Sequence, residues 1–84
     1  MTKYTVVWLR DAEDELGRIW MDAANRRAVA SAANLIDDEL RTDPDLVGAH
    51  VKGTFRTLEY SPLEIIFDVR TEDRLVRVLW VRQT

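Results

Sequence analysis

Apolar residues recur along the first half of the chain at spacings typical of one strand followed by two helices. The segment Tyr4–Leu9 is rich in β-branched and aromatic residues, which favours a strand. Asp11 predicts the N-cap of a helix whose apolar residues lie on one face. These residues are Ala12, Leu16, Ile19, Trp20 and Ala23. A second stripe of Val29, Ala32, Ile36 and Leu40 predicts another helix, which ends at Thr42-Asp43-Pro44.

The second half predicts a loop and then three strands. Residues 43–53 contain Pro44, Gly48 and Gly53 and have no apolar period, so we expect a surface loop. Three strand patterns follow, over Thr54–Tyr60, Leu63–Arg70 and Leu75–Val81. The order is β-α-α-β-β-β, and it predicts an α+β fold with a helical hairpin on one face of a mainly antiparallel four-stranded sheet. The other face of the sheet is expected to be open.

Length and composition narrow the classes of protein that need to be considered. The 84 residues, with 46% hydrophobic content, predict a single domain over residues 1–84 with one core. The absence of cysteine excludes a disulfide framework and a thiol nucleophile. No apolar run approaches the roughly 20 residues of a membrane span and no signal peptide is recognised, so we expect a cytoplasmic protein. We expect no metal and no small-molecule cofactor.

Charge is distributed unevenly along the chain. Residues 1–47 contain six Lys+Arg and ten Asp+Glu, whereas residues 48–84 contain six and five, which gives −4 and +1. The acidic runs Glu13–Glu15 and Asp37–Glu39 are interpreted as solvated helix faces, because consecutive helical residues point in different directions. His50 could serve as a general base, but it lies in a polar loop with no partner acid beside it.

Aromatic and basic residues define a candidate binding patch. Arg56 and Tyr60 share one face of their strand, and Trp80 and Arg82 share one face of the last strand. We expect Leu75, Leu79 and Val81 to face the core, which turns Val76, Val78, Trp80 and Arg82 outward beside Arg56. Such a patch could stack a nucleobase or anchor a protein, and the alternative is core packing of Trp80 and Tyr60 with solvated arginines.

The order of these segments resembles the RelE/ParE family of toxins from bacterial type II toxin–antitoxin systems. The matching segments are Tyr4–Trp8, Ala12–Leu16, Ile36–Leu40 followed by Pro44 and Gly48, Phe55–Leu58, Ile65–Val69 and Val76–Val81. Together they cover nearly the whole chain. The resemblance implies a growth-inhibiting toxin that is held inactive by a cognate antitoxin.

The family contains ribosome-dependent mRNA endonucleases and inhibitors of DNA gyrase. In the endonucleases the open face of the sheet carries several cations and a tail tyrosine, which suit a pentavalent phosphate. Here Arg56 stands at the position of the first of two lysines that the endonucleases carry on their second strand. Leu58 stands where the second lysine would be and Glu64 where an arginine of the third strand would be, and the chain ends at Thr84 without the tyrosine. Arg82 is a possible substitute.

The resemblance therefore predicts a toxin that binds a cellular target, with the gyrase-inhibitor branch favoured and inefficient mRNA cleavage expected. A ribosome-dependent mRNA endonuclease using Arg56 and Arg82 as catalytic groups is the enzyme alternative, and a degenerate, non-toxic binding module is the third. The implied partners are the antitoxin and either gyrase or the ribosome with its mRNA. Arg56, Tyr60, Trp80 and Arg82 are the candidate target- or partner-binding residues. The acidic helical half is expected to bind the antitoxin as an amphipathic helix or an added strand.

Overall fold

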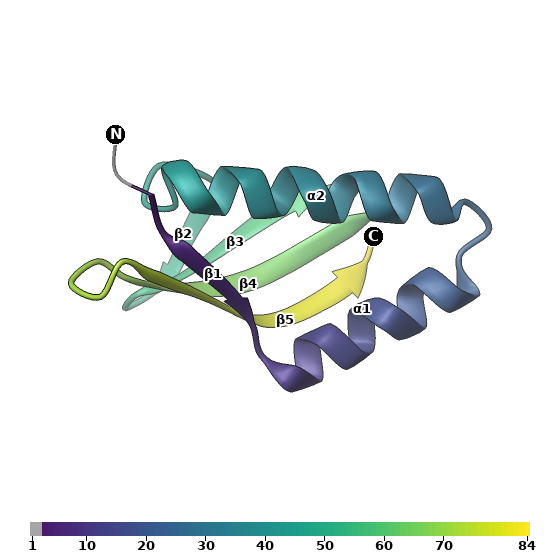
Figure 1. Cartoon of the computed structure of the whole chain (residues 1–84), viewed down its shortest axis with the longest axis horizontal. Coiled ribbons are helices and arrows are strands. Elements are labelled where there is room, and N and C mark those ends of the chain that lie inside the picture. Colours follow the sequence, from purple (N-terminus) through teal and green to yellow (C-terminus); the bar gives the residue numbers. More distant parts are fainter. Residues whose placement is uncertain (1–2) are drawn as a thin grey trace.

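The computed structural model describes residues 3–84 and shows two helices on one face of a five-stranded sheet (Figure 1). The elements are β1 (Thr5–Trp8), α1 (Arg10–Asp22), α2 (Arg26–Thr42), β2 (Ala49–Lys52), β3 (Phe55–Tyr60), β4 (Leu63–Arg70) and β5 (Leu75–Gln83). The sheet order is β1-β5-β4-β3-β2. β1 runs parallel to β5 and every other neighbouring pair is antiparallel. The expected α+β fold is confirmed, with one strand more than predicted.

The additional strand, β2, lies within the segment that we expected to be a loop. All four of its residues are exposed, so the strand has no buried face and the sequence shows no alternation. It forms a hairpin with β3 through a turn in which Gly53 adopts a φ of 58°. That left-handed conformation is easy for glycine and costly for most other residues. The loop prediction for residues 43–53 is therefore wrong at Ala49–Lys52.

Each helix starts differently. α1 begins at Arg10 with Leu9 at the N-cap and no side-chain cap, so the prediction that Asp11 caps it is wrong. Asp11 and Glu13 instead lie in the first turn, where acidic side chains interact favourably with the helix dipole. The start of α2 is capped by the Asn25 side chain, which accepts a hydrogen bond from the Ala28 backbone N–H at 3.1 Å.

The core lies between the helices and the sheet, and most of its members follow the predicted periodicities. The buried residues are Ala12 and Ile19 of α1, Val29, Ala32, Ile36 and Leu40 of α2, Leu63, Ile65, Phe67 and Val69 of β4, and Val76, Val78 and Val81 of β5. Tyr4, Val6 and Trp8 pack against this core from the β1 side. Trp20, expected on the apolar stripe of α1, is 41% exposed.

A β-bulge in β5 changes which residues face the core. Ile66 pairs with Trp80 but Phe67 pairs with Val78, so Leu79 has no partner on β4. One extra residue reverses the inward and outward alternation. Val76 and Val78 are therefore buried before the bulge and Val81 after it, which contradicts the expectation that Val76 and Val78 face outward. Trp80 and Arg82 lie on the other face of the sheet, at the edge where β5 and α1 together line a hollow.

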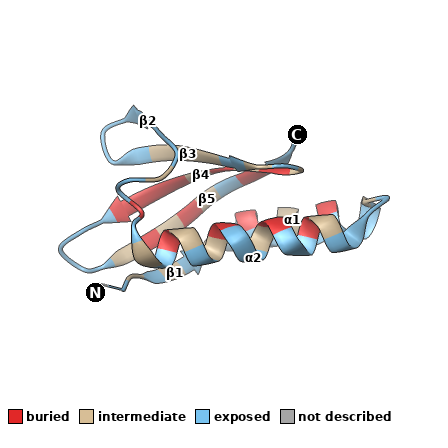
Figure 2. Cartoon of the chain, turned by 90° about the horizontal axis from the view of Figure 1, so that it is seen from above, coloured by how far each residue is buried: buried red, intermediate tan, exposed pale blue. Residues whose placement is uncertain are grey.

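Within residues 3–84, no helix covers the remaining face of the sheet (Figure 2). No helix within residues 3–84 is both long enough and apolar enough to cross a membrane. The expectation that the chain starts without a signal peptide falls partly on Met1 and Thr2, which lie outside the described residues.

Candidate functional site

The strand register separates the four candidate residues into two groups. Arg56 pairs with Phe67 and Tyr60 pairs with Leu63, and because cross-strand partners point to the same side, both lie on the helix-bearing face. Trp80 pairs with Ile66 and Arg82 with Glu64, which places them on the opposite face. The expected single patch is therefore wrong, because the core-facing residues of β4 fix Arg56 and Tyr60 on the other side of the sheet.

On the open face, Trp80 and Arg82 form a small cluster with Glu64. The Arg82 Nε donates to Glu64 Oε1 at 2.6 Å, and its guanidinium lies 5.8 Å from the centre of the Trp80 ring. Trp80 is 43% exposed, so its ring is accessible. The carboxylate of Glu64 already occupies the Arg82 cation, which leaves this cluster less suited to an anion than an unpaired arginine would be.

On the helix-bearing face, Tyr60 links the sheet to α2. Its hydroxyl donates a hydrogen bond to Glu39 Oε1 at 3.1 Å. This bond, together with partial burial and the negative charge of Glu39, raises the pKa of the Tyr60 hydroxyl above its usual range. The contact gives Tyr60 a structural part in joining β3 to α2. Its predicted role in partner binding stays a prediction.

Arg56 holds the loop that precedes β2. Its Nε donates to the Val47 carbonyl at 3.1 Å and its Nη2 to the Gly48 carbonyl at 3.4 Å. Gly48 has a φ of 70°, and a Cβ at this position would overlap the Thr57 backbone. Glycine is therefore required where the loop crosses β3, and Arg56 then fixes the loop beside it.

A polar pocket lies where the β2–β3 hairpin meets the end of β4 and the start of the β4–β5 turn. It has a volume of about 190 Å³ and is lined by Asp45, His50, Gly53, Thr54, Arg56, Val69 and Thr71. His50 is the direct cross-strand partner of Arg56. Cβ atoms of such partners lie about 5 Å apart, and both residues line the pocket.

The imidazole of His50 is held in one orientation. Its Nε2 lies 2.8 Å from the Gly53 carbonyl oxygen. A carbonyl oxygen can only accept, so Nε2 carries the hydrogen and, in the neutral ring, Nδ1 has the free lone pair. The expectation that His50 lies in a loop is wrong, because it lies on β2, where Arg56 is its cross-strand partner. Sequence reasoning missed the pair because it did not find β2.

A buried carboxylate, Asp68, was also missed. Asp68 is 1% exposed and lies on the open-face side of β4. It accepts hydrogen bonds from the Thr54 hydroxyl, from Arg77 Nη2 at 2.5 Å and from Arg70 Nε at 3.2 Å. Burial alone would raise its pKa, but these hydrogen bonds outweigh burial and leave the pKa of Asp68 below its usual range. Arg77, the one charged residue in the apolar run of the last strand, was the available sequence signal.

No three histidine, aspartate or glutamate side chains within residues 3–84 gather closely enough to form a metal site. The polar pocket itself offers a proton acceptor at His50 and a cation at Arg56. This combination can activate a hydroxyl group and stabilise an oxyanion.

Comparisons with known proteins find the same fold in toxin structures. No protein-family model matches the chain, and neither does any curated protein sequence. The structure is similar to a chain of the toxin–antitoxin complex RelBE2 from Mycobacterium tuberculosis, with a TM-score of 0.81 and 18% identity over 100% of this chain and 94% of that chain. It is also similar to the isolated RelE toxin of E. coli, with a TM-score of 0.63 and 15% identity over 96% and 84% of the two chains. The shared fold is the one that the sequence resemblance implies.

Proposed function

We propose that this chain is the toxin of a toxin–antitoxin pair and is neutralised by a cognate antitoxin protein. The observation that carries the proposal is the structural match to the RelBE2 chain, which extends over the whole of this chain and 94% of the other. Because the match covers nearly all of both chains, neither chain has a large element that the other lacks. The sequence resemblance to the RelE/ParE family, found on separate grounds, supports the same function.

Growth of bacteria that express the chain tests this function. Expression from a tightly controlled promoter should stop growth, and co-expression of the protein encoded next to the toxin gene should restore it. Normal growth at an expression level that is verified by immunoblot would overturn the proposal. Growth arrest that no neighbouring gene product relieves would overturn the antitoxin part.

Of the two branches of the family, we favour RNA cleavage over gyrase inhibition, which reverses the preference formed from the sequence. Both structures described above are of RelE or RelBE proteins, and RelE is the type to which the mRNA endonuclease alternative belongs. The polar pocket adds a second reason, because the pairing of His50 with Arg56 supplies a base and a cation at one place. Arg82 cannot assist Arg56 there, since it lies on the opposite face of the sheet.

The chemistry that suits this pocket is attack by the 2′-hydroxyl of RNA on the adjacent phosphate. His50 Nδ1 accepts the hydroxyl proton while the 2′-oxygen bonds to phosphorus. The bond from phosphorus to the 5′-oxygen breaks as the 2′,3′-cyclic phosphate forms, and the leaving oxygen takes up a proton from water. Arg56 stabilises the negative charge that grows on the phosphate oxygens in the transition state.

Variants on the two faces of the sheet separate the pocket from the open face. His50→Gln keeps an N–H for the Gly53 carbonyl and removes the base. It should therefore lower the rate of RNA cleavage by about 10² or more and relieve growth inhibition. Arg82→Gln removes a cation of the same type from the open face and should leave inhibition unchanged. Circular dichroism verifies that both variants fold. Full toxicity of His50→Gln together with loss in Arg82→Gln would assign the function to the open face instead.

A further inference from the structure

Strand β2, which carries His50, has little packing to hold it in place. All four of its residues are exposed, and it lies at the edge of the sheet beside β3. The pairing of these two strands is interrupted by a register shift between His50 and Lys52. A segment with few buried apolar contacts opens easily unless individual hydrogen bonds hold it. The direction of the His50 ring therefore depends on what fixes the hairpin turn that follows it.

The carbonyl that orients the His50 ring belongs to the turn. The imidazole Nε2 donates to the Gly53 carbonyl oxygen at 2.8 Å. That oxygen is part of the planar peptide unit that joins Gly53 to Thr54. A change in the position of Thr54 therefore moves the carbonyl and, with it, the imidazole. His50, Gly53 and Thr54 all line the polar pocket, so the movement would occur at the site itself.

Two hydrogen bonds attach Thr54 to β4. Its hydroxyl donates to Asp68 Oδ1, and its carbonyl oxygen accepts from the Val69 backbone N–H at 3.4 Å. One bond holds the side chain and the other holds the backbone, and they go to consecutive residues of the same strand. Because β4 lies inside the sheet between β3 and β5, these bonds connect the exposed turn to a well-packed part of the molecule.

Asp68 is a rigid anchor for the Thr54 hydroxyl. The residue is 1% exposed, and its Oδ2 accepts from Arg77 Nη2 at 2.5 Å and from Arg70 Nε at 3.2 Å. Hydrogen bonds between charged partners are roughly twice as strong as those between neutral ones. With Oδ2 held by two guanidinium groups, the carboxylate keeps one orientation and presents Oδ1 to Thr54. The interactions therefore extend from a buried charge to the polar pocket.

We propose that Asp68 and Thr54 are positioning residues for His50. Through the Gly53 carbonyl they hold the imidazole in the one tautomer that leaves Nδ1 free as a proton acceptor. Neither residue needs to touch RNA. The use of this acceptor on RNA rests on the proposed function, whereas the fixed tautomer does not. Because a misplacement of about 1 Å can lower a rate by about 10², loss of the Thr54 hydroxyl should slow a reaction that depends on His50.

Three substitutions isolate the Thr54 hydroxyl. Thr54→Val keeps the branched shape and removes the donor to Asp68, whereas Thr54→Ser keeps the donor. Thr71→Val is the matched control, because Thr71 is also exposed and lines the same pocket. Asp68 itself is left unchanged, since its two arginine partners would lose their counter-charge. Circular dichroism verifies that each variant folds.

The nitrogen signals of the imidazole report the tautomer directly. The chain contains one histidine, so NMR of the untagged protein with ¹⁵N-labelled histidine assigns both ring nitrogens to His50. At a pH where the ring is neutral, the wild type should show well-separated signals for protonated Nε2 and unprotonated Nδ1. Thr54→Val should bring the two signals together, because both tautomers become populated, and should lower the yield of new RNA 5′ ends by about tenfold or more. Thr54→Ser and Thr71→Val should match the wild type in both measurements.

The two measurements separate this inference from the proposed function. Merged ring signals in the wild type, or signals that stay apart in Thr54→Val, overturn the positioning role even if RNA cleavage falls. An equal change in Thr54→Ser or Thr71→Val also overturns it, because the hydroxyl is then not the cause. Thr54→Ala replaces Thr54→Val if the valine variant does not fold. A chain that shows the expected ring signals in every variant but cleaves no RNA keeps the positioning of His50 and loses the proposed function.

Discussion

At the scale of single residues, the buried carboxylate of Asp68 links stability to ion pairing and to pH. It is the one charged side chain buried among residues 3–84. Three donors from β4, β5 and the β2–β3 turn converge on its two oxygens, so the carboxylate joins elements that are separate in sequence. The Nε of Arg77 is itself buried and has no hydrogen-bond partner in the described chain, whereas its Nη2 donates to Asp68.

Replacing Asp68 with asparagine should destabilise the protein by about 3 kcal/mol, because removing one partner of a buried ion pair leaves the other charge uncompensated. The matched control is Glu64→Gln, which breaks the more exposed pair with Arg82 and should cost about 1 kcal/mol or less. Urea denaturation of the three proteins measures both values. Similar midpoints for the two variants would show that the Asp68 network contributes no more than a surface pair.

The same residue predicts how stability depends on acid. The pKa of Asp68 is lowered in the folded state, whereas an unfolded aspartate has a pKa of about 3.9. The unfolded state therefore binds more protons in this range, and the stabilisation is complete above about pH 5 and is lost as pH falls through the folded pKa. Asp68→Asn should lose less stability than the wild type between about pH 5 and pH 2. Parallel stability curves for the two proteins would contradict this assignment.

At the scale of elements, the bulge in β5 decides which surfaces the sheet presents. Because Leu79 is unpaired on β4, the strand buries Val78 and Val81 and turns Trp80 and Arg82 to the open face. Without the bulge, one alternation would continue through the strand and would bury Trp80. The one extra residue, Leu79, thereby places Trp80 on the face of the sheet opposite to the one that carries Arg56.

Truncation of Trp80 tests this arrangement. Trp80→Ala should lower stability by about 1 kcal/mol or less, because the residue lies on the open face, is 43% exposed and has Arg82 only at 5.8 Å from its ring centre. Ile65→Ala, fully buried on the neighbouring strand, should cost about 3 kcal/mol and serves as the reference. Thermal denaturation in which Trp80→Ala loses as much stability as Ile65→Ala would mean that the indole is part of the core.

The sequence predicts those elements that have one buried and one exposed side. β4 and α2 were located closely because their apolar residues recur at periods of two and of three to four. β2 was missed because an edge strand that is exposed throughout has no period. On β5 the outward direction of Trp80 and Arg82 was predicted correctly, and that of Val76 and Val78 was not, because both sides of the strand are apolar. The bulge that reverses the alternation depends on pairing with β4, which the sequence of one strand does not show.

The candidate site could be predicted less well than the fold. Arg56 was identified from the pattern of its own strand, but which residues lie beside it depends on two pairings with other strands. The first is the pairing of β2 with β3, which brings His50 opposite Arg56. The second is the register of β3 on β4, which places Arg56 on the face away from Trp80 and Arg82. Both are long-range pairings, which local sequence patterns do not specify.

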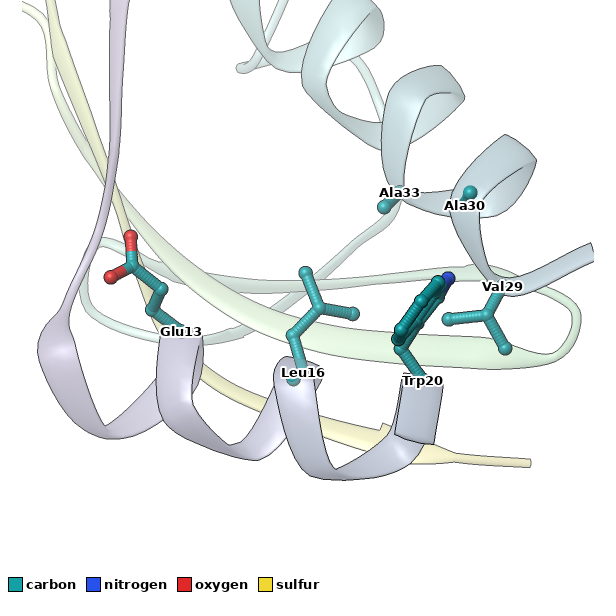
Figure 3. Close-up of a pocket in the computed structure, with 7 residues that line it drawn as sticks. Glu13, Leu16, Trp20, Val29, Ala30 and Ala33 are labelled. Carbon is teal, nitrogen blue, oxygen red and sulfur yellow. The ribbon is translucent and has the colours of Figure 1, made fainter. Parts of the chain in front are cut away.

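At the scale of the whole molecule, the structure has three separate surfaces. The polar pocket with His50 and Arg56 lies at the β2–β3 end of the sheet, an apolar groove lies between α1 and α2, and the Trp80–Arg82 cluster lies on the open face. Figure 3 shows the groove, which has a volume of about 280 Å³ and is lined mainly by Leu16, Trp20, Val29, Ala30 and Ala33. The helices carry the net negative charge of the chain, so the acidic surface of the molecule lies apart from the polar pocket.

Sequencing of RNA 5′ ends after a short induction of the chain in bacteria tests the central claim most directly, because it detects cleavage rather than its consequences for growth. The wild-type chain should produce new 5′ ends within translated messages, and His50→Gln, expressed to the same level and folded, should produce none. Growth arrest by the wild type with no new RNA ends, accompanied by a DNA-damage response, would contradict the account and return the protein to the gyrase-inhibiting branch.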